Sequence, residues 1–179
     1  MNLILAILSG LAGLVILFLI IAAFVKKSYS LSSEITINQP KQLVFEYLKL
    51  LRNQDNFSKW ALMDPNMKKE YHGTDGVAGF IYAWDSEQKN VGKGEQEIIK
   101  ITEGEQIDFE IRFIKPFAGI AKAYLSTVSL SENETQVIWG FSSKMKYPMN
   151  LMLLFMNMDK MVGNDLSIGL SNLKSILEK

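Results

Sequence analysis

The fold is decided by residues 106–143, which read QIDFEIRFIKPFAGIAKAYLSTVSLSENETQVIWGFSS. Apolar and polar residues alternate over residues 106–114, as they do in a strand with one buried face. Two more strand-like stretches, residues 120–130 and 135–143, follow after short links. Strands that follow one another through short links pair antiparallel. The segment therefore predicts an antiparallel meander of three strands.

Four further strand-like stretches extend this sheet toward the N-terminus. Gly, Asn, Asp and Pro residues punctuate them, as expected for the turns between strands. The stretches cover residues 31–37, 67–72, 77–85 and 91–101. Together with the meander they predict a sheet of about seven strands.

Apolar residues at helical spacing mark two more elements. Residues 40–51 predict an amphipathic helix with Asn38 as its N-cap. Over residues 148–178 the helical spacing returns and predicts one long final helix. A polar loop, residues 52–65, carries Trp60. The order of elements predicts an α+β domain, in which helices cover one face of an antiparallel sheet.

The N-terminus is an apolar run, NLILAILSGLAGLVILFLIIAAFV, from residue 2 to 25. As a helix it is roughly 36 Å long, enough to cross a hydrocarbon core of about 30 Å. Lys26 and Lys27 close the run, so the positive-inside rule predicts that the following residues are cytoplasmic. We therefore expect a single-pass protein of the cell membrane, with a transmembrane anchor at 1–27 and a domain at 28–179.

A cleaved signal peptide is the alternative to an anchor. It requires a basic start, a shorter apolar region and a small-x-small cleavage site. The chain has no basic residue before the run, the run is too long, and residues 28–30 (SYS) fit a cleavage site poorly. The anchor is therefore the favoured interpretation.

Composition excludes several classes of function. The 19 basic and 19 acidic residues balance, which argues against nucleic acid as a partner, because that affinity comes from excess positive charge. The chain has no cysteine and a single histidine, His72, so thiolate chemistry and sites with two imidazoles are excluded. We expect no metal and no cofactor.

Several phrases of the sequence are typical of one superfamily. They are ITINQPKQLVFEYL (35–48), LMDPNMKKEYHG (62–73), VGKGE (91–95), VIWGF (137–141) and LMLLFMNMDKMVGNDLSIGLSNLK (151–174). With these phrases the chain resembles the START and birch-pollen-allergen-like superfamily, also labelled SRPBCC or polyketide cyclase/dehydrase-like. The resemblance implies a helix-grip fold, a curved sheet wrapped around a long C-terminal helix with an apolar cavity between them. Members of the superfamily bind lipids, sterols or polyketides, some are cyclases or dehydratases, and others are co-chaperones.

Aromatic and methionine side chains supply the candidate lining of such a cavity. Aromatic residues gather on one face of several predicted strands, and flexible methionines recur along the predicted final helix, where Asp159 is an isolated charge. The candidate ligand contacts are Trp60, Phe80, Tyr82, Trp84, Phe109, Ile111, Trp139, Phe141, Met152, Met156 and Asp159. The alternative for the aromatic and methionine residues is an ordinary filled core, and for Asp159 a place facing water.

These observations lead to a membrane-tethered module that binds a hydrophobic or lipid-like small molecule. Two alternatives stay open: a cyclase- or dehydratase-type enzyme acting on an apolar substrate in the same cavity, and a co-chaperone-like module that binds proteins. Catalysis would need an inward acid or base, for which Asp159, Tyr82 and His72 are the candidates. We assign none of them a catalytic role, and whether the chain is an enzyme stays open at this stage.

Overall fold

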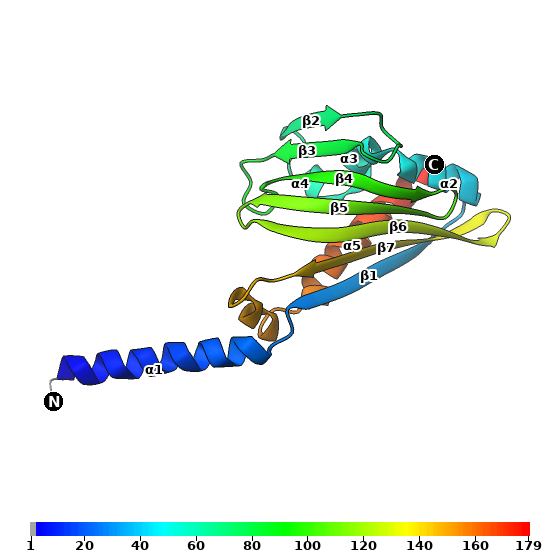
Figure 1. Cartoon of the computed structure of the whole chain (residues 1–179). Helices are drawn as coiled ribbons and strands as arrows, with labels where there is room; N and C mark the ends of the chain where they lie inside the picture. Colours follow the sequence, from blue (N-terminus) through cyan, green and yellow to red (C-terminus); the bar gives the residue numbers. More distant parts are fainter. Residues whose placement is uncertain (1–2) are drawn as a thin grey trace.

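Seven antiparallel strands form one sheet in the computed structural model, which describes residues 3–179 (Figure 1). The strands are β1 (Ser28–Ile37), β2 (Lys68–His72), β3 (Ile81–Asp85), β4 (Lys93–Thr102), β5 (Gln106–Lys115), β6 (Gly119–Ser131) and β7 (Glu134–Lys144). Their order in the sheet is β1-β7-β6-β5-β4-β3-β2, so each strand from β2 to β7 pairs with its neighbour in sequence. The first strand closes the other edge by pairing with β7, from Ser28 opposite Lys144 to Ile37 opposite Thr135. The predicted meander is confirmed.

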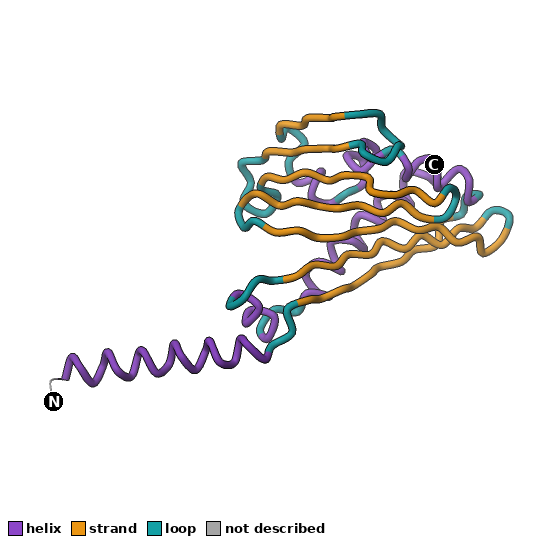
Figure 2. Tube along the Cα trace, in the orientation of Figure 1, coloured by secondary structure: helices purple, strands orange, loops and turns teal. Residues whose placement is uncertain are grey.

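Helices cover one face of this sheet (Figure 2). They are α2 (Lys41–Lys49), η1 (Leu51–Asn53), α3 (Gln54–Phe57), α4 (Lys59–Met63), the π-helical turn η3 (Asp159–Gly163) and α5 (Asn164–Leu177). Two further helices, α1 (Leu3–Phe24) and η2 (Met149–Leu154), lie apart from this face. Strands β5, β6 and β7 match their predicted ranges to within one residue at each end. The predicted cap of α2 is wrong: no side chain caps this helix, and the Asn38 backbone N–H donates instead to Glu178 Oε1 at 2.6 Å.

The prediction of one final helix from residue 148 is also wrong. Helical structure pauses between η2 and η3, and the continuous helix begins only at Asp159. Asn157 gives a physical reason, because its Oδ1 accepts the Lys160 backbone N–H at 2.9 Å and so satisfies a free donor of a new helix start. The preceding segment turns toward α1 instead of continuing along the sheet (Figure 1).

Apolar side chains fill the half of the domain that contains α2. Phe45 and Leu48 of α2 are buried with Leu173 of α5 against Leu125 of β6 and Ile107 of β5. Figure 1 shows α2 and the C-terminus at the end of the domain opposite α1. The solid core therefore lies at the end far from α1, and any internal space has to lie nearer to it.

Helix α1 extends away from the domain (Figure 1). Its 22 residues span about 33 Å at 1.5 Å per residue, and it is long and apolar enough to cross a membrane. Only Ala22 of this helix is buried, beneath Asn150. The Asn150 Nδ2 group donates to the carbonyl oxygens of Ala22 at 2.7 Å and Val25 at 3.1 Å, so a residue from the other end of the chain caps this helix.

Candidate ligand-binding cavity

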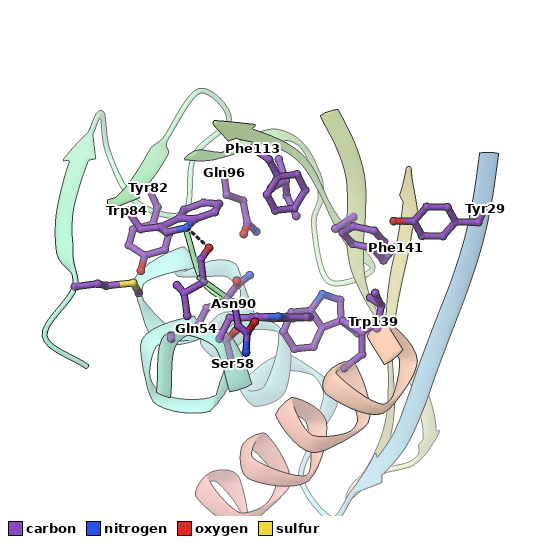
Figure 3. A pocket seen from close by; sticks show the side chains of 18 residues that line it. Tyr29, Gln54, Ser58, Tyr82, Trp84, Asn90, Gln96, Phe113, Trp139 and Phe141 are labelled. Atoms are coloured by element: carbon purple, nitrogen blue, oxygen red, sulfur yellow. Dashed lines mark hydrogen bonds between the residues drawn. The ribbon is translucent and has the colours of Figure 1, made fainter. Parts of the chain in front are cut away.

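A cavity of about 260 Å³ lies between the sheet, α4 and the start of the final helix (Figure 3). Figure 3 shows Tyr82 and Trp84 on one side of it, Trp139 and Phe141 on the other, and Phe113 between them. The lining residues are Tyr29, Gln54, Ser58, Trp60, Ala61, Met67, Tyr82, Trp84, Asn90, Val91, Gln96, Ile111, Phe113, Ala123, Trp139, Phe141, Val162 and Leu166.

Two glycines make room for the indole rings that form the walls. A Cβ atom on Gly94 of β4 would lie 2.7 Å from the Trp84 ring, and one on Gly169 of α5 would lie 2.7 Å from the Trp139 ring. Each ring therefore rests directly on bare backbone. A side chain at either position would force an indole to move, and at Gly94 it would also meet the Arg112 carbonyl oxygen at 2.7 Å.

Edge contacts between aromatic rings fix the walls further. The Trp84 and Phe113 rings meet nearly at right angles with centroids 6.4 Å apart, and those of Trp60 and Trp139 do so at 6.3 Å. Such edge-to-face pairs add to the stability that burial alone provides. The Trp84 Nε1–H donates to the Val91 carbonyl oxygen at 3.3 Å, so this indole has a partner for its polar atom within the protein.

Four polar side chains that the sequence interpretation missed also line the cavity: Gln54, Ser58, Asn90 and Gln96. Gln54 is only 5% exposed and Gln96 only 8%. The Nε2 group of Gln54 is buried and donates no hydrogen bond within the protein. A buried donor without a partner costs about 1–3 kcal/mol. Gln54 is also a lining residue, so the cavity borders an amide whose donor has no partner within the protein.

Gln96 could have been found from the sequence, because it occupies an inward position of β4 between buried Gly94 and Ile98. A polar residue on the buried face of an alternating strand is an informative exception. Gln54 gives no such signal. It lies in a polar stretch after α2, and the periodicity of that stretch does not show that it packs against the sheet.

Tyr82 is held in place by a charged cluster behind the cavity wall. Its hydroxyl donates to Asp55 Oδ1 at 3.1 Å, while the Tyr71 hydroxyl donates to Asp55 Oδ2 at 3.2 Å. Lys69 Nζ lies 2.9 Å from Asp55 Oδ1 and balances its charge. Burial, followed by the negative charge of Asp55, raises the pKa of Tyr82 well above its ordinary value. Tyr82 therefore stays protonated at any physiological pH.

Ionisable groups are scarce in the lining. Only the two tyrosines, Tyr29 and Tyr82, are ionisable, and burial is the main cause that raises the pKa of each. Among the residues described, no carboxylate, imidazole or amine lines the cavity. Over residues 3–179 there is also no cluster of three His, Asp or Glu side chains that could hold a metal ion. This lining suits the binding of an apolar molecule better than proton transfer.

Comparisons with known proteins find relatives of the structure but not of the sequence. No protein-family model and no curated protein matches the chain. Norcoclaurine synthase from Thalictrum flavum, in complex with dopamine and hydroxybenzaldehyde, superposes with a TM-score of 0.63 at 10% identity, over 88% of this chain and 90% of that one. Ginseng major latex-like protein 151 from Panax ginseng gives 0.56 at 12% identity, over 84% and 98%. A protein from Nitrosospira multiformis gives 0.53 at 17% identity, over 83% and 96%.

The chain has the helix-grip fold. The sheet order, the final helix across one face and the superposed structures agree on this. At these low identities the likeness shows the fold alone, so function has to be argued from the site.

The helix-grip cavity contains six of the eleven candidate ligand contacts: Trp60, Tyr82, Trp84, Ile111, Trp139 and Phe141. Phe80 and Phe109 lie outside it, buried in the solid core, so the filled-core alternative holds for them. Met152, Met156 and Asp159 also lie outside, because the break before Asp159 carries these residues toward α1. The structure does not bring these three residues to the cavity.

The two remaining acid–base candidates are not among the residues that line the cavity. Asp159 is exposed on the surface, which agrees with the water-facing alternative for this residue. His72 is exposed at the end of edge strand β2, near Glu70. Neither side chain lines the cavity.

Proposed function

We propose that this chain is a membrane-tethered module that binds a compact, ring-containing apolar molecule with one hydrogen-bond acceptor. In this proposal residues 1–27 are the anchor, residues 28–179 are the binding domain, and the lysines after the anchor keep the domain cytoplasmic. One observation carries the proposal: an aromatic cavity of about 260 Å³ whose lining includes Gln54, an amide with a buried donor that has no partner in the protein.

The size of the cavity limits the ligand. Small-molecule sites usually enclose about 300–1,000 Å³, so this one, just below that range, suits a molecule of two or three rings or a short chain. Burial of about 300 Å² of apolar ligand surface yields roughly 7 kcal/mol before the costs of association. Without those costs 7 kcal/mol corresponds to a dissociation constant of about 10 μM, so the affinity is micromolar at best, which allows exchange with a membrane.

The chemistry of the lining selects the ligand class. The flat walls formed by Trp84, Trp139 and Phe113 favour a planar molecule, because aromatic rings contact one another best in offset or edge-on arrangements. An acceptor on the ligand would relieve the unpaired amide of Gln54. The norcoclaurine synthase structure, which holds dopamine and hydroxybenzaldehyde, supports the idea that this fold accommodates small aromatic molecules.

Binding is favoured over catalysis because both ionisable lining groups, Tyr29 and Tyr82, have raised pKa values and stay neutral. A general base that removes a proton near pH 7 would need a carboxylate or an imidazole in reach. Gln54, Ser58, Asn90 and Gln96 can orient a ligand by hydrogen bonds but cannot exchange protons at that pH.

Tryptophan fluorescence provides a direct test, because all three tryptophans, Trp60, Trp84 and Trp139, line the cavity. The full chain in nanodiscs is titrated with 6-propionyl-2-dimethylaminonaphthalene, a compact ketone that accepts energy from tryptophan. We expect saturable energy transfer with a midpoint of about 10 μM or higher.

The control is a pair of variants on β6. Ala123→Leu places a larger side chain in the cavity, whereas Lys122→Leu places the same side chain on the exposed neighbouring position. The probe concentration at the midpoint of the titration should rise at least tenfold for Ala123→Leu and stay unchanged for Lys122→Leu. If both variants and the unaltered chain give the same non-saturable transfer, the probe is only in the bilayer and the proposal fails.

A further inference from the structure

The segment between β7 and the final helix forms a surface beside the exit of α1. Its Tyr147 hydroxyl donates to the Leu19 carbonyl oxygen at 3.2 Å, and Asn150 caps the same helix through Ala22 and Val25. These partners belong to the last two turns of the apolar helix. The segment is therefore fixed at the level where α1 leaves the domain.

Large apolar side chains are exposed on this surface. Phe155 is 82% exposed, and Phe117, at the turn between β5 and β6, is 73% exposed. Figure 1 shows this turn at the end of the sheet from which α1 departs. We call the following residues the membrane-proximal patch: Phe117, Tyr147, Met149, Met152, Leu154 and Phe155. Exposed apolar residues gathered at one place indicate an interaction site.

Lysines without ion pairs surround the same exit. They are Lys26, Lys27, Lys144, Lys146 and Lys160, all exposed, and over the described residues none of them takes part in a salt bridge. Strand pairing brings the first four of them together, since Ser28 pairs with Lys144 and the Met145 backbone N–H donates to the Lys27 carbonyl oxygen. Lys160 lies in η3, which packs beside β1. Apolar groups ringed by free cations match an anionic lipid surface, where each lysine near the headgroups adds to the attraction.

We infer that the membrane-proximal patch is a second membrane contact, which lies in the headgroup region of an anionic bilayer next to α1. The inference rests on the proposed anchor, because α1 places the patch at the bilayer surface. Tyr29, Phe113, Phe141 and Val162 line the cavity near the same end of the domain. Contact through the patch holds that end toward the lipid, so the ligand class is one that enters from the bilayer.

Depth measurements on single-cysteine variants test this inference, since the chain has no cysteine of its own. A nitrobenzoxadiazole label is placed by L14C within α1, by F155C on the patch and by L130C at the distal end of β6. The full chain is reconstituted in phosphatidylcholine–phosphatidylglycerol nanodiscs, with brominated acyl chains as quencher. We expect strong quenching at 14, intermediate quenching at 155 and none at 130.

Each pattern of quenching decides the matter. If position 155 is as unquenched as position 130 while position 14 is quenched, the anchor stands and the patch does not touch lipid. If position 14 is also unquenched, the anchor itself is wrong and the inference falls with it. A label at 155 that is shielded from water but not quenched by the brominated lipid, together with cross-links between copies, would show that a second copy of the chain covers the patch. That result would overturn the inference.

A charge-reversal pair separates lipid contact from simple proximity. Lys144→Glu with Lys146→Glu should reduce quenching at 155 by at least half in anionic nanodiscs and leave position 14 unchanged. The matched control, Lys100→Glu with Lys179→Glu, reverses two exposed lysines at the end of the domain far from α1 and should leave both positions unchanged. Equal loss in the two pairs would mean that net charge alone acts, which contradicts the role of the patch. Probe uptake by the cavity is measured separately, so loss of either property is distinguishable from loss of the other.

Discussion

Replacement of Gln54 by leucine should stabilise the free domain and weaken ligand binding at the same time. The amide is buried and its Nε2 donor lacks a partner, so its removal recovers about 1–3 kcal/mol of desolvation cost. For a domain of this size, 1 kcal/mol corresponds to about 2–4 °C in melting temperature. We therefore expect Gln54→Leu to raise the midpoint of thermal unfolding by at least 2 °C.

The effect on binding depends on the ligand. A net hydrogen bond contributes about 0.5–1.5 kcal/mol, which is a factor of about two to ten in affinity. Two competitors of nearly equal shape, 2-acetylnaphthalene and 2-ethylnaphthalene, differ by the carbonyl acceptor. Gln54→Leu should weaken displacement of the fluorescent ketone by the acetyl compound two- to tenfold and leave displacement by the ethyl compound unchanged.

Thermal unfolding followed by circular dichroism and competitive displacement followed by tryptophan energy transfer measure the two effects on the full chain. Gln42→Leu is the control, because Gln42 is exposed on α2 and hydrogen-bonds only Glu46. The reasoning is refuted if Gln54→Leu lowers the unfolding midpoint, which would show that the amide has a partner in the folded protein. It is equally refuted if both competitors lose the same affinity.

Three further changes test other parts of the structure. Gly169→Ala should push the Trp139 ring into the cavity and weaken probe binding about tenfold. Ser171→Ala, on the exposed side of α5, should leave probe binding unchanged. Equal probe affinities in the two variants would contradict the described position of the Trp139 ring. The pKa of Tyr82 is higher in the folded than in the unfolded chain, so its contribution to stability is complete below about pH 10 and is lost as pH rises further, by up to about 1.4 kcal/mol per pH unit. Tyr82→Phe should therefore reduce the dependence of the unfolding free energy on pH, measured by denaturant titrations between pH 9 and 11. An unchanged dependence would count against the burial of this hydroxyl. Arg112→Leu should lower the free energy of unfolding by about 1–3 kcal/mol at pH 7 and by less in acid. Arg112 donates hydrogen bonds to Glu95, Glu97 and Glu110, and without Arg112 the three carboxylates repel one another unless acid protonates them. A loss of stability that does not change with pH would contradict this explanation.

Local patterns in the sequence were enough for the sheet. Alternation in β5 and β7 and the short turns between strands depend on neighbouring residues, which the sequence shows directly. Arg112 and Glu110 occupy polar positions in the alternation of β5, and they form ion pairs with each other and with Glu95 and Glu97 of β4 on the same face of the sheet.

The start of the final helix could not be predicted from periodicity. Residues 148–158 have helical spacing, but Asn150 and Asn157 hydrogen-bond α1 and the Lys160 backbone instead. Whether residues 148–158 form a regular helix or make these contacts depends on α1, which is more than 120 residues away in the sequence. The misplacement of Met152, Met156 and Asp159 followed from this one break.

The lining residues on the strands could be predicted from the sequence, and those on the short helices could not. The aromatic walls follow from strands whose faces can be assigned, as at Trp84 and Trp139. The floor comes from the short helices α3 and α4, where Gln54 and Ser58 turn inward because of tertiary contacts. The sequence pattern of residues 52–65 indicates a loop and does not say which side chains face the sheet.

Native mass spectrometry of the full chain released from membranes tests the binding of an apolar ligand most directly. The chain purified without added ligand should retain one small apolar molecule per protein, and that mass should be displaced by 2-acetylnaphthalene. The molecule should be absent from Ala123→Leu and present in Lys122→Leu. A chain that carries no such molecule, and that also gives no saturable energy transfer to the fluorescent ketone, would contradict the proposed function.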